Sequence, residues 1–234
     1  MSEKFKALMI TNENGDYKSK FELIGLEDLP DHPVLIDVAY STVNYKDGLA
    51  LTGKGGKVVR NFPMVGGVDL SGTVIESKSD KFSEGDRVLV NGWGLSETQW
   101  GGFSQKQRIN PDYLTKVPES FSLEEVMAIG TAGYTAMLCI LALEDMCIKP
   151  EKGKIIVTGA SGGVGSISVA ILAKLGYEVS ACTGRLEEED YLRSLGAKEV
   201  IDRNSFNRDA RPLERGRWAG AVDSVGSKIL STII

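Results

Sequence analysis

The stretch Lys154–Gly165 combines a short apolar run with a cluster of glycines, which is the composition of a phosphate-binding turn. Residues Lys154–Thr158 are typical of a strand that is buried on both faces. Ala160–Gly165 then follows the G-x-G-x-x-G pattern, with alanine in the first glycine position. Glycines let the chain turn sharply and bring its amides close to a pyrophosphate, while the next helix points its N-terminus at the charge. A purely structural glycine turn is the alternative. We predict a dinucleotide site with contacts from Ser161, Gly162, Gly163 and Val164.

The residues after the next predicted strand, Tyr177–Cys182, indicate which nucleotide fits. Proteins that prefer NAD place a carboxylate about 20 residues beyond the glycines, where it binds the ribose hydroxyls. Here the strand is followed by Thr183, Gly184 and Arg185. A carboxylate would repel a 2′-phosphate, whereas Thr183 and Arg185 would hold one. The sequence therefore favours NADPH, and an ordinary solvated arginine is the alternative for Arg185.

A second class of nicotinamide enzyme shares part of the glycine pattern. Thr158, Gly159, Gly163 and Gly165 have the spacing found in short-chain dehydrogenases. That class also needs a tyrosine followed four residues later by a lysine, whose charge lowers the pKa of the tyrosine. The tyrosines beyond Gly165 are followed at that distance by alanine and leucine, so the short-chain interpretation fails.

Ligands for a metal are scarce. A catalytic zinc needs three protein ligands drawn from cysteine, histidine and carboxylates. The single histidine, His32, lies in a predicted turn between two prolines, and the three cysteines are far apart in the sequence. We therefore expect no metal site, and we expect Cys139, Cys147 and Cys182 to be buried structural thiols in a reducing cytoplasm.

Composition argues against two classes of partner. The 234 residues carry a net charge of −5 and contain no long basic stripe, so nucleic acid is not an expected partner. No run of 18 or more apolar residues occurs, and the first six residues lack the apolar stretch of a signal peptide. We expect a cytoplasmic protein that does not bind membranes.

The pattern of predicted elements changes near residue 120. Residues 1–120 read as short strands separated by turns, and residues 121–234 read as alternating strands and helices. Ser122 and Glu125 have the spacing of a capping box, and Gly130–Gly133 interrupts the helix that follows. The later strands are predicted at Lys154–Thr158, Tyr177–Cys182, Glu199–Asp202 and Trp218–Asp223. The fold class is therefore α/β, with a β domain followed by a doubly wound parallel sheet.

Several segments together resemble the medium-chain dehydrogenase/reductase superfamily, in its zinc-independent quinone oxidoreductase-like branch and the acrylyl-CoA reductase group. The likeness covers essentially the whole chain, and the segments that carry it are Asn44–Ala50, Arg60–Met64, Gly67–Val74, Gly130–Met137, Val157–Gly165 and Trp218–Asp223. Zinc alcohol dehydrogenases place a cysteine near Asn44 and a His-Glu pair near Val68 and Asp69, and neither occurs here.

The resemblance implies a GroES-like domain at 1–120 and a Rossmann NADP-binding domain at 121–234, with NADPH in the cleft. It implies that Asn44 and Tyr45 face the nicotinamide, with Tyr45 as a hydrogen-bond or proton donor, and that Thr131 contacts the cofactor. A packed aromatic at a strand end is the alternative for Tyr45, and a helix-bending hydroxyl is the alternative for Thr131. Asp69 and Arg87 are expected to form an ion pair between loops.

The resemblance also implies about a hundred further residues that complete the sheet and support a homodimer in the full-length form. Only four strands of a 3-2-1-4-5-6 sheet are predicted before Ile234. The sequence is therefore expected to lack the C-terminal third of the family, through truncation, a frameshift or division of a longer protein.

Three functions follow as expectations. The first is NADPH-dependent reduction of an activated C=C bond, acrylyl-CoA to propionyl-CoA. The second is an NADPH:quinone oxidoreductase, whose substrate carries no CoA. The third is a catalytically inactive homologue that still binds NADPH. The sequence alone does not separate a CoA thioester from a quinone.

Overall fold

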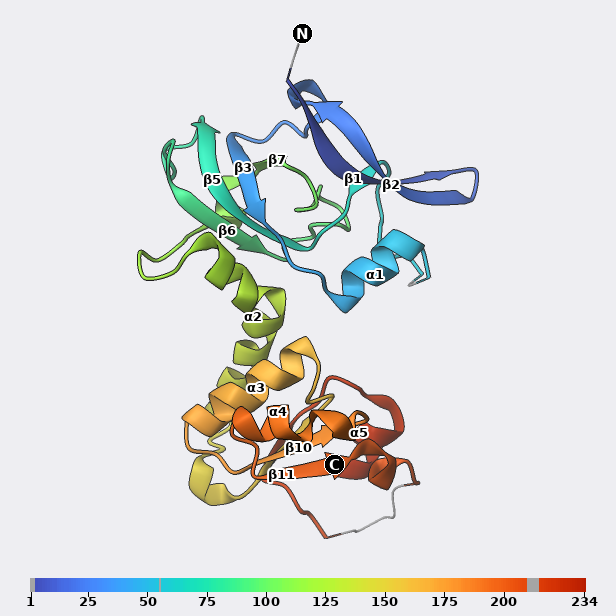
Figure 1. Ribbon diagram of the computed structural model, residues 1–234, viewed down its shortest axis with the longest axis vertical. Coiled ribbons are helices and arrows are strands. Elements are labelled where there is room, and N and C mark those ends of the chain that lie inside the picture. The colour runs from blue at the N-terminus through green and yellow to red at the C-terminus, as the bar shows by residue number, and fades with distance from the viewer. Residues whose placement is uncertain (1–2, 55, 210–214) are drawn as a thin grey trace. The chain divides into compact units, whose positions relative to one another are not determined.

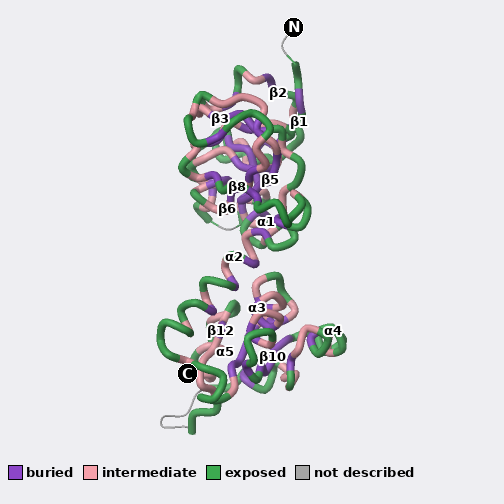
Figure 2. Tube along the Cα trace, turned by 90° about the vertical axis from the view of Figure 1, so that its left-hand side faces the viewer, coloured by how far each residue is buried: buried purple, intermediate pink, exposed green. Residues whose placement is uncertain are grey.

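The protein is described by a computed structural model that covers residues 3–54, 56–209 and 215–234 (Figure 1). The chain divides into two compact units, Met1–Thr131 and Ala132–Ile234, each with most of its contacts inside itself. We call these the first and second units. Buried residues concentrate in the strands of each unit (Figure 2).

The first unit holds two antiparallel sheets. A long hairpin, β1 (Lys4–Glu13) and β2 (Asp16–Gly25), joins β4 (Met64–Val65) in the order β2-β1-β4. The two turn residues, Asn14 and Gly15, both have positive φ, which suits the twist of a two-residue hairpin loop. The second sheet has the order β7-β3-β5-β6-β8. Its strands are β3 (Val34–Tyr40), β5 (Asp69–Ser77), β6 (Arg87–Asn91), β7 (Lys106–Ile109) and β8 (Thr115–Lys116).

A short helix, α1 (Tyr45–Thr52), follows β3 in the first unit and was not predicted from the sequence. It ends at Gly53, whose φ of 67° gives the left-handed conformation common after a helix. Ala50 is buried against Ile10 and Met64 beneath the β1–β4 sheet. Asn44 is the N-cap residue of this helix, directly before its first residue, Tyr45.

The second unit is built on a parallel sheet in the order β11-β10-β9-β12. Its strands are β9 (Ile155–Thr158), β10 (Val179–Thr183), β11 (Glu199–Asp202) and β12 (Gly220–Val222). All four predicted strands are present, with shifts of one to two residues at the ends of three of them. The helices are α3 (Gly163–Lys174), α4 (Glu189–Ser194) and α5 (Ser227–Ile233). The predicted α/β class is confirmed.

Both faces of this sheet are covered, which is why its central strands, β9 and β10, are buried throughout and mostly apolar. Ile155 and Val157 of β9 point to the face that packs on Val169 and Leu172 of α3, in a cluster that also contains Leu192 of α4. The next residue along the strand, Ile156, belongs to the opposite face, because side chains alternate along a strand. A second cluster there includes Cys182, Phe206, Ile229 and Ile233, from β10, a 3₁₀ turn and α5.

Helix α2 (Leu123–Asp145) begins and bends where the sequence predicts. The Glu125 amide donates to Ser122 Oγ at 3.1 Å, and the Ser122 amide donates to Glu125 Oε2 at 2.8 Å, so the capping box is confirmed. Gly130, with φ 52° and ψ −160°, interrupts the helical backbone.

By length and composition α2 is apolar enough to cross a membrane. Only 33% of its most apolar window is buried inside the protein. Val126 and Met127 pack in a cluster of the first unit, and Ile140 packs in the main core of the second.

Short 3₁₀ turns connect several of these elements. They lie at Leu26–Asp28, Pro111–Tyr113, Pro150–Lys152, Leu186–Glu188 and Arg203–Phe206. The last of them follows β11 directly, which places Arg203 at the carboxyl end of the parallel sheet. Ligands of open parallel sheets bind at that end.

Candidate functional site: a glycine turn in the second unit and a polar loop in the first

The glycine turn lies between β9 and α3, as predicted. Gly159 has φ +59°, and the Gly162 amide donates to the Gly159 carbonyl at 2.8 Å, which closes a tight turn. A Cβ on Gly165 would lie 2.2 Å from the Gly159 carbonyl oxygen, so only glycine allows the helix to pack this close to the turn. Helix α3 begins at Gly163, and the first amides of a helix have no acceptor within it. These exposed donors fit a pyrophosphate.

The end of β10 is tied to this turn through three predicted site residues. Ser161 Oγ and Thr183 Oγ1 are 2.6 Å apart, and the Arg185 amide donates to Thr183 Oγ1 at 3.0 Å. Arg185 Nη2 also donates to the Ser161 carbonyl at 2.6 Å. Thr183 is 3% exposed, so its hydroxyl holds the turn together from within. Arg185 is exposed and is the charged member of this cluster.

In the first unit, Asp69 organises the loop that leads to Asn44. The Asp69 side chain is buried, and its carboxylate accepts the Thr42 amide at 2.9 Å and the Thr42 hydroxyl at 2.6 Å. It also accepts the Thr131 amide at 3.0 Å and the Thr131 hydroxyl at 2.7 Å. Asn44 Nδ2 donates in turn to Thr42 Oγ1 at 2.8 Å. The predicted residues Asn44 and Thr131 are therefore linked through a carboxylate that sequence reasoning assigned to another role.

Asp69 does not pair with Arg87, so that prediction was wrong. Arg87 instead donates from Nη1 to the Phe121 carbonyl at 2.8 Å and from Nη2 to the Pro118 carbonyl at 3.3 Å. Arg87 therefore anchors the segment before α2. A buried carboxylate needs several donors to replace lost hydration, and Thr42 and Thr131 supply them.

A second buried carboxylate, Asp47, supports the start of α1. Its Oδ2 accepts the Asn44 amide at 2.7 Å, and its Oδ1 accepts the Val68 amide at 3.0 Å. The pKa of Asp47 is raised above its ordinary value, mainly by burial and also by the nearby charge of Asp69. The hydrogen bonds from Asn44 and Val68 act in the opposite direction. Together the two carboxylates hold the backbone of residues 42–44 on both sides.

Tyr45 is the first residue of α1 and is 85% exposed. The alternative of a packed aromatic at a strand end is therefore wrong. Its hydroxyl is accessible to a ligand from solvent. Asn44, directly before it, is partly buried and held by the bonds to Thr42 and Asp47.

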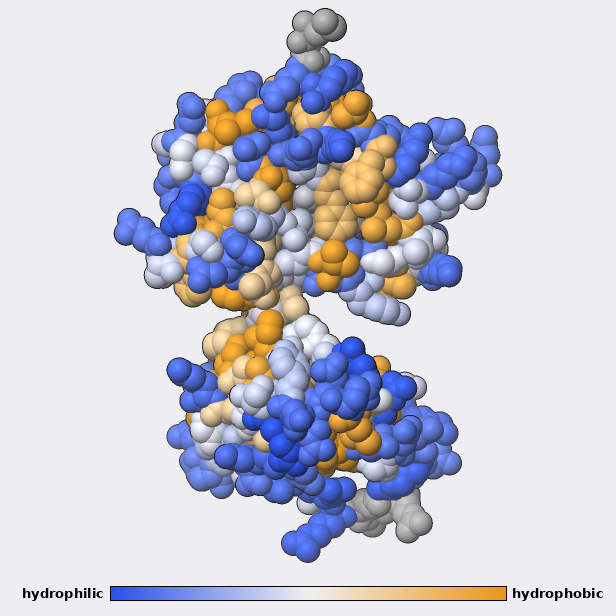
Figure 3. Space-filling view, in the orientation of Figure 1, coloured by the Kyte–Doolittle hydropathy of each residue, from blue (hydrophilic) through white to orange (hydrophobic). Residues whose placement is uncertain are grey.

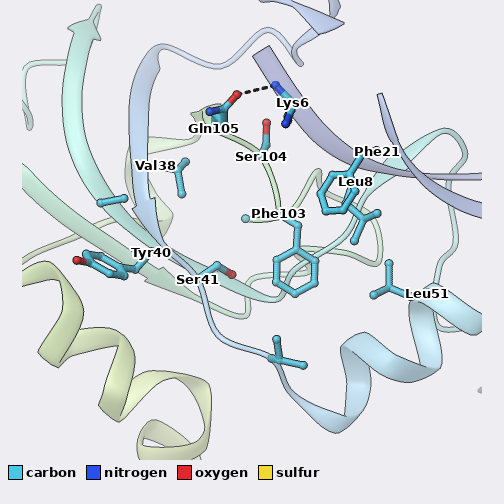
Figure 4. A pocket seen from close by; sticks show the side chains of 13 residues that line it. Lys6, Leu8, Phe21, Val38, Tyr40, Ser41, Leu51, Phe103, Ser104 and Gln105 are labelled. Carbon is cyan, nitrogen blue, oxygen red and sulfur yellow. Dashed lines mark hydrogen bonds between the residues drawn. The ribbon is translucent and has the colours of Figure 1, made fainter. Parts of the chain in front are cut away.

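The first unit also contains an apolar cavity of about 530 Å³ beside this loop (Figure 4). Leu8, Phe21, Val43, Leu51 and Phe103 are among the apolar residues that line it. Lys6, Ser104 and Gln105 are polar residues at one end, where the Lys6 amide donates to Gln105 Oε1 at 2.8 Å. Apolar residues also reach the surface elsewhere in this unit (Figure 3).

Residues able to bind a metal are dispersed over the described parts of the chain. No group of three or more histidine, cysteine, aspartate or glutamate side chains is close enough there to hold an ion. His32 Nε2 lies 3.3 Å from Gln99 Oε1. Among the cysteines, Cys182 is buried, Cys139 is partly buried and Cys147 is exposed, so the prediction of a buried thiol was wrong for Cys147. Cys147 follows the end of α2 with φ +57°, outside the helical packing.

Known proteins share this arrangement. Residues 30–119 match the alcohol dehydrogenase GroES-like domain, which confirms the predicted β domain. Acrylyl-CoA reductase AcuI of Ruegeria pomeroyi is 47% identical over 233 residues, which span 98% of this chain and 70% of that protein. The structure of Escherichia coli K-12 YhdH with bound NADPH has a TM-score of 0.91 at 48% identity, covering 96% of this chain and 69% of that one.

The Bacillus subtilis protein described as "Putative quinone oxidoreductase YhfP" is 45% identical over 236 residues, 100% of this chain and 71% of its own. Its structure with NAD bound has a TM-score of 0.93 at 44% identity, covering 99% of this chain and 70% of that one. This chain thus spans about 70% of the length of these relatives. The identity over nearly the whole chain shows that it belongs to the medium-chain dehydrogenase/reductase superfamily, in the group of acrylyl-CoA reductases and related quinone oxidoreductases.

Proposed function

We propose that this chain is an NADPH-dependent oxidoreductase that reduces the activated C=C bond of acrylyl-CoA to give propionyl-CoA. The observation that carries the proposal is the cluster of Ser161, Thr183 and Arg185 at the end of β10. This cluster sets an exposed arginine at the position where an NAD-preferring protein has a carboxylate. The acrylyl-CoA reductase relative and the NADPH-bound relative support the same function.

The two proposed subsites have separate tasks. Ser161, Gly162, Gly163 and Val164 bind the pyrophosphate, and Gly184 and Arg185 bind the ribose 2′-phosphate. Thr183 supports both subsites through its bonds to Ser161 Oγ and to the Arg185 amide. Thr131, which directly follows the kink of α2 at Gly130, contacts the cofactor. When bound, NADPH supplies the hydride that adds to the β-carbon of the thioester.

The residues of the 42–45 loop act on the substrate. Hydride addition places negative charge on the thioester oxygen, and donors aimed at that oxygen stabilise the enolate. Asn44 supplies such a donor, held in place by Thr42 and Asp47. Tyr45, with an accessible hydroxyl, supplies a hydrogen bond or the proton that completes reduction at the α-carbon. This reaction needs no metal.

Quinone reduction is the second candidate, supported by the Bacillus subtilis relative and by the apolar cavity that Ser41 and Val43 help to line. The NAD found in that relative also makes cofactor choice a point for direct measurement. An inactive NADPH-binding homologue is the third. We further propose a cytoplasmic protein, a division into GroES-like residues 1–120 and NADP-binding residues 121–234, and a homodimer in the full-length form.

The test measures NADPH oxidation at 340 nm with acrylyl-CoA and, separately, with 1,4-benzoquinone. NADPH binding is followed in parallel by the change in nicotinamide fluorescence. Faster turnover of acrylyl-CoA with NADPH than with NADH supports the first function. Turnover of the quinone alone selects the second, binding without turnover selects the third, and absence of NADPH binding contradicts all three.

A further inference from the structure

Two positively charged side chains share one carboxylate beside the start of α1, in the first unit. Lys46 is the second residue of that helix and forms an ion pair with Glu97 Oε1. The other oxygen of this carboxylate lies 3.9 Å from Arg60 Nη2. The Arg60 amide also donates to the Glu97 carbonyl at 2.8 Å. Glu97 therefore ties the start of α1 to the segment that ends at Arg60.

That segment carries a third cation, Lys57, and it packs against α1. Val59 is buried in a cluster that also contains Ala50 of the helix. Lys46 lies on the same helical face as Ala50, one turn earlier, because residues four apart in a helix are neighbours. The backbone on either side of Val59 is thus held next to α1. Lys57 is exposed, and the side chain of Arg60 is 65% exposed, so their charged groups are open to a ligand.

Positive charge is in excess on this surface, which we define as Lys46, Lys57 and Arg60. In the described parts of the chain, Glu97 is the only carboxylate within 4.0 Å of a charged nitrogen of these three residues. One negative charge cannot neutralise three positive ones. The protein as a whole carries a net charge of −5, so this surface has the opposite sign to the rest of the molecule. Such a local field attracts anions.

Phosphates are the anions that fit these side chains best. A guanidinium presents several donors in a fixed fork to phosphate oxygens, and a lysine adds a mobile point charge. In a CoA thioester the phosphates lie at the far end of the pantetheine arm, so their site must lie apart from the reacting carbonyl. Asn44 directly precedes α1, whose eight residues span about 12 Å. A thioester held at Asn44 can therefore extend its arm along α1 to the cationic surface.

We propose that Lys46, Lys57 and Arg60 bind the phosphates of the 3′-phospho-ADP group of CoA. This inference rests on the proposed function, and it names the residues that select a CoA thioester over a quinone, which has no phosphate. Glu97 orients Lys46 and Arg60. As a competing negative charge, it also limits the affinity of the surface for phosphate.

Binding is measured first, independently of any turnover. Isothermal titration calorimetry gives dissociation constants for 3′,5′-ADP, which is the phosphate-bearing fragment of CoA, and for 2′,5′-ADP and inorganic phosphate. The double variant Lys57→Ala, Arg60→Ala should weaken 3′,5′-ADP binding by about 10- to 100-fold, as expected for loss of two partly exposed charged contacts. Its affinity for 2′,5′-ADP, the fragment of NADPH, should change by less than about 2-fold, because that fragment contacts other residues.

A variant of the carboxylate should act in the opposite direction. Glu97→Gln removes the competing charge with little change of side-chain shape, so it should strengthen 3′,5′-ADP binding by about 2- to 5-fold at low salt. A merely structural role of Glu97 would produce no gain. Added salt should reduce the gain, because it screens exposed charges. The control is Lys81→Ala, an exposed lysine of the same unit that pairs with Asp112 and should leave every constant unchanged. Thermal melting confirms that each variant is folded.

Kinetics then connect the surface with the choice of substrate. The ratio kcat/KM is measured with NADPH for acrylyl-CoA and for acrylyl-pantetheine, which has the same reacting thioester without the 3′-phospho-ADP group. The preference for acrylyl-CoA should fall by about 10-fold or more in the double variant. Unchanged 3′,5′-ADP binding in that variant, or equal losses for 3′,5′-ADP, 2′,5′-ADP and phosphate, would overturn the site. A wild-type protein that binds 3′,5′-ADP as expected but reduces neither thioester would contradict the proposed function alone.

Discussion

The carboxylate of Asp69 accepts two hydrogen bonds from Thr131, one from the amide at 3.0 Å and one from the hydroxyl at 2.7 Å. These bonds connect the first residue of β5 with the residue that follows the kink of α2. The same carboxylate holds Thr42, which in turn accepts from the Asn44 amide group. One buried charge therefore fixes both the candidate catalytic loop and a candidate cofactor residue.

Asp69→Ala should destabilise the first unit by about 3 kcal/mol or more. The substitution leaves the partly buried amides of Thr42 and Thr131 without an acceptor, and each unsatisfied buried group costs about 1–3 kcal/mol. Urea unfolding measures the loss. Asp80→Ala, at an exposed position in the same unit, is the control and should change stability by less than about 0.5 kcal/mol. Equal effects of the two variants would contradict the organising role of Asp69.

Thr183→Val should weaken NADPH and NADH binding by similar factors. The change keeps the side-chain shape but removes the bonds to Ser161 and to the Arg185 amide, which hold the glycine turn for either cofactor. About 1 kcal/mol per bond predicts a loss of roughly 10-fold or more in affinity. Thr183→Ser should restore most of it. A loss confined to NADPH would mean that the Thr183 hydroxyl binds the 2′-phosphate directly.

Gly165→Ala should destabilise the second unit, because its methyl group would lie 2.2 Å from the Gly159 carbonyl oxygen and 2.7 Å from Ala160 Cα. Relief of this overlap must move α3 away from the turn, at a cost of about 1–3 kcal/mol or more. The comparison is Gly48→Ala in α1, where an added Cβ meets nothing within 4 Å. That change should stabilise the protein by about 0.5–1 kcal/mol through helix propensity. Thermal melting that shows the same sign for both variants would contradict this packing.

The cysteines should differ strongly in reactivity. Burial raises the pKa of the Cys182 thiol to about 11, so at pH 8 almost none of it is the reactive thiolate. Cys147 is exposed and should react first with a disulfide reagent, and Cys182 should react only after unfolding. The pKa of Cys182 is 9.0 in the unfolded chain and about 11 in the folded protein. The contribution of this thiol to the stability of the fold is therefore fully present below pH 9.0, and it is lost as the pH rises through about 11. Rapid labelling of Cys182 in the folded protein, detected by peptide mapping, would contradict its burial.

Chelation should leave the activity unchanged. Hydride transfer to a polarised C=C bond or to a quinone needs no Lewis acid, and the chain has a single histidine with few cysteines. Treatment with EDTA followed by assay, together with elemental analysis of the purified protein, checks this expectation. One zinc ion bound per chain, removed together with activity, would contradict a zinc-independent mechanism.

Local signals in the sequence were sufficient for much of the second unit. The glycine turn, the capping box at Ser122 and Glu125, and the interruption at Gly130 depend on residues within a few positions of one another. The apolar runs of the parallel strands are equally local, and β11 begins and ends at the predicted residues. Helix α1 was missed because Gly48 weakens its helical signal and its support comes from the distant Val68 amide through Asp47.

The sequence by itself therefore determined the fold class, the order of the strands in the second unit and the presence of a glycine turn typical of dinucleotide sites. Only the tertiary structure decided that Asp69 binds Thr42 and Thr131 in place of Arg87, and that Arg203 lies across Gly184. Those contacts join residues 19 to 62 positions apart, through strand register and side-chain direction. A buried carboxylate takes whichever donors the packed backbone brings within reach, and this choice is made by the fold as a whole.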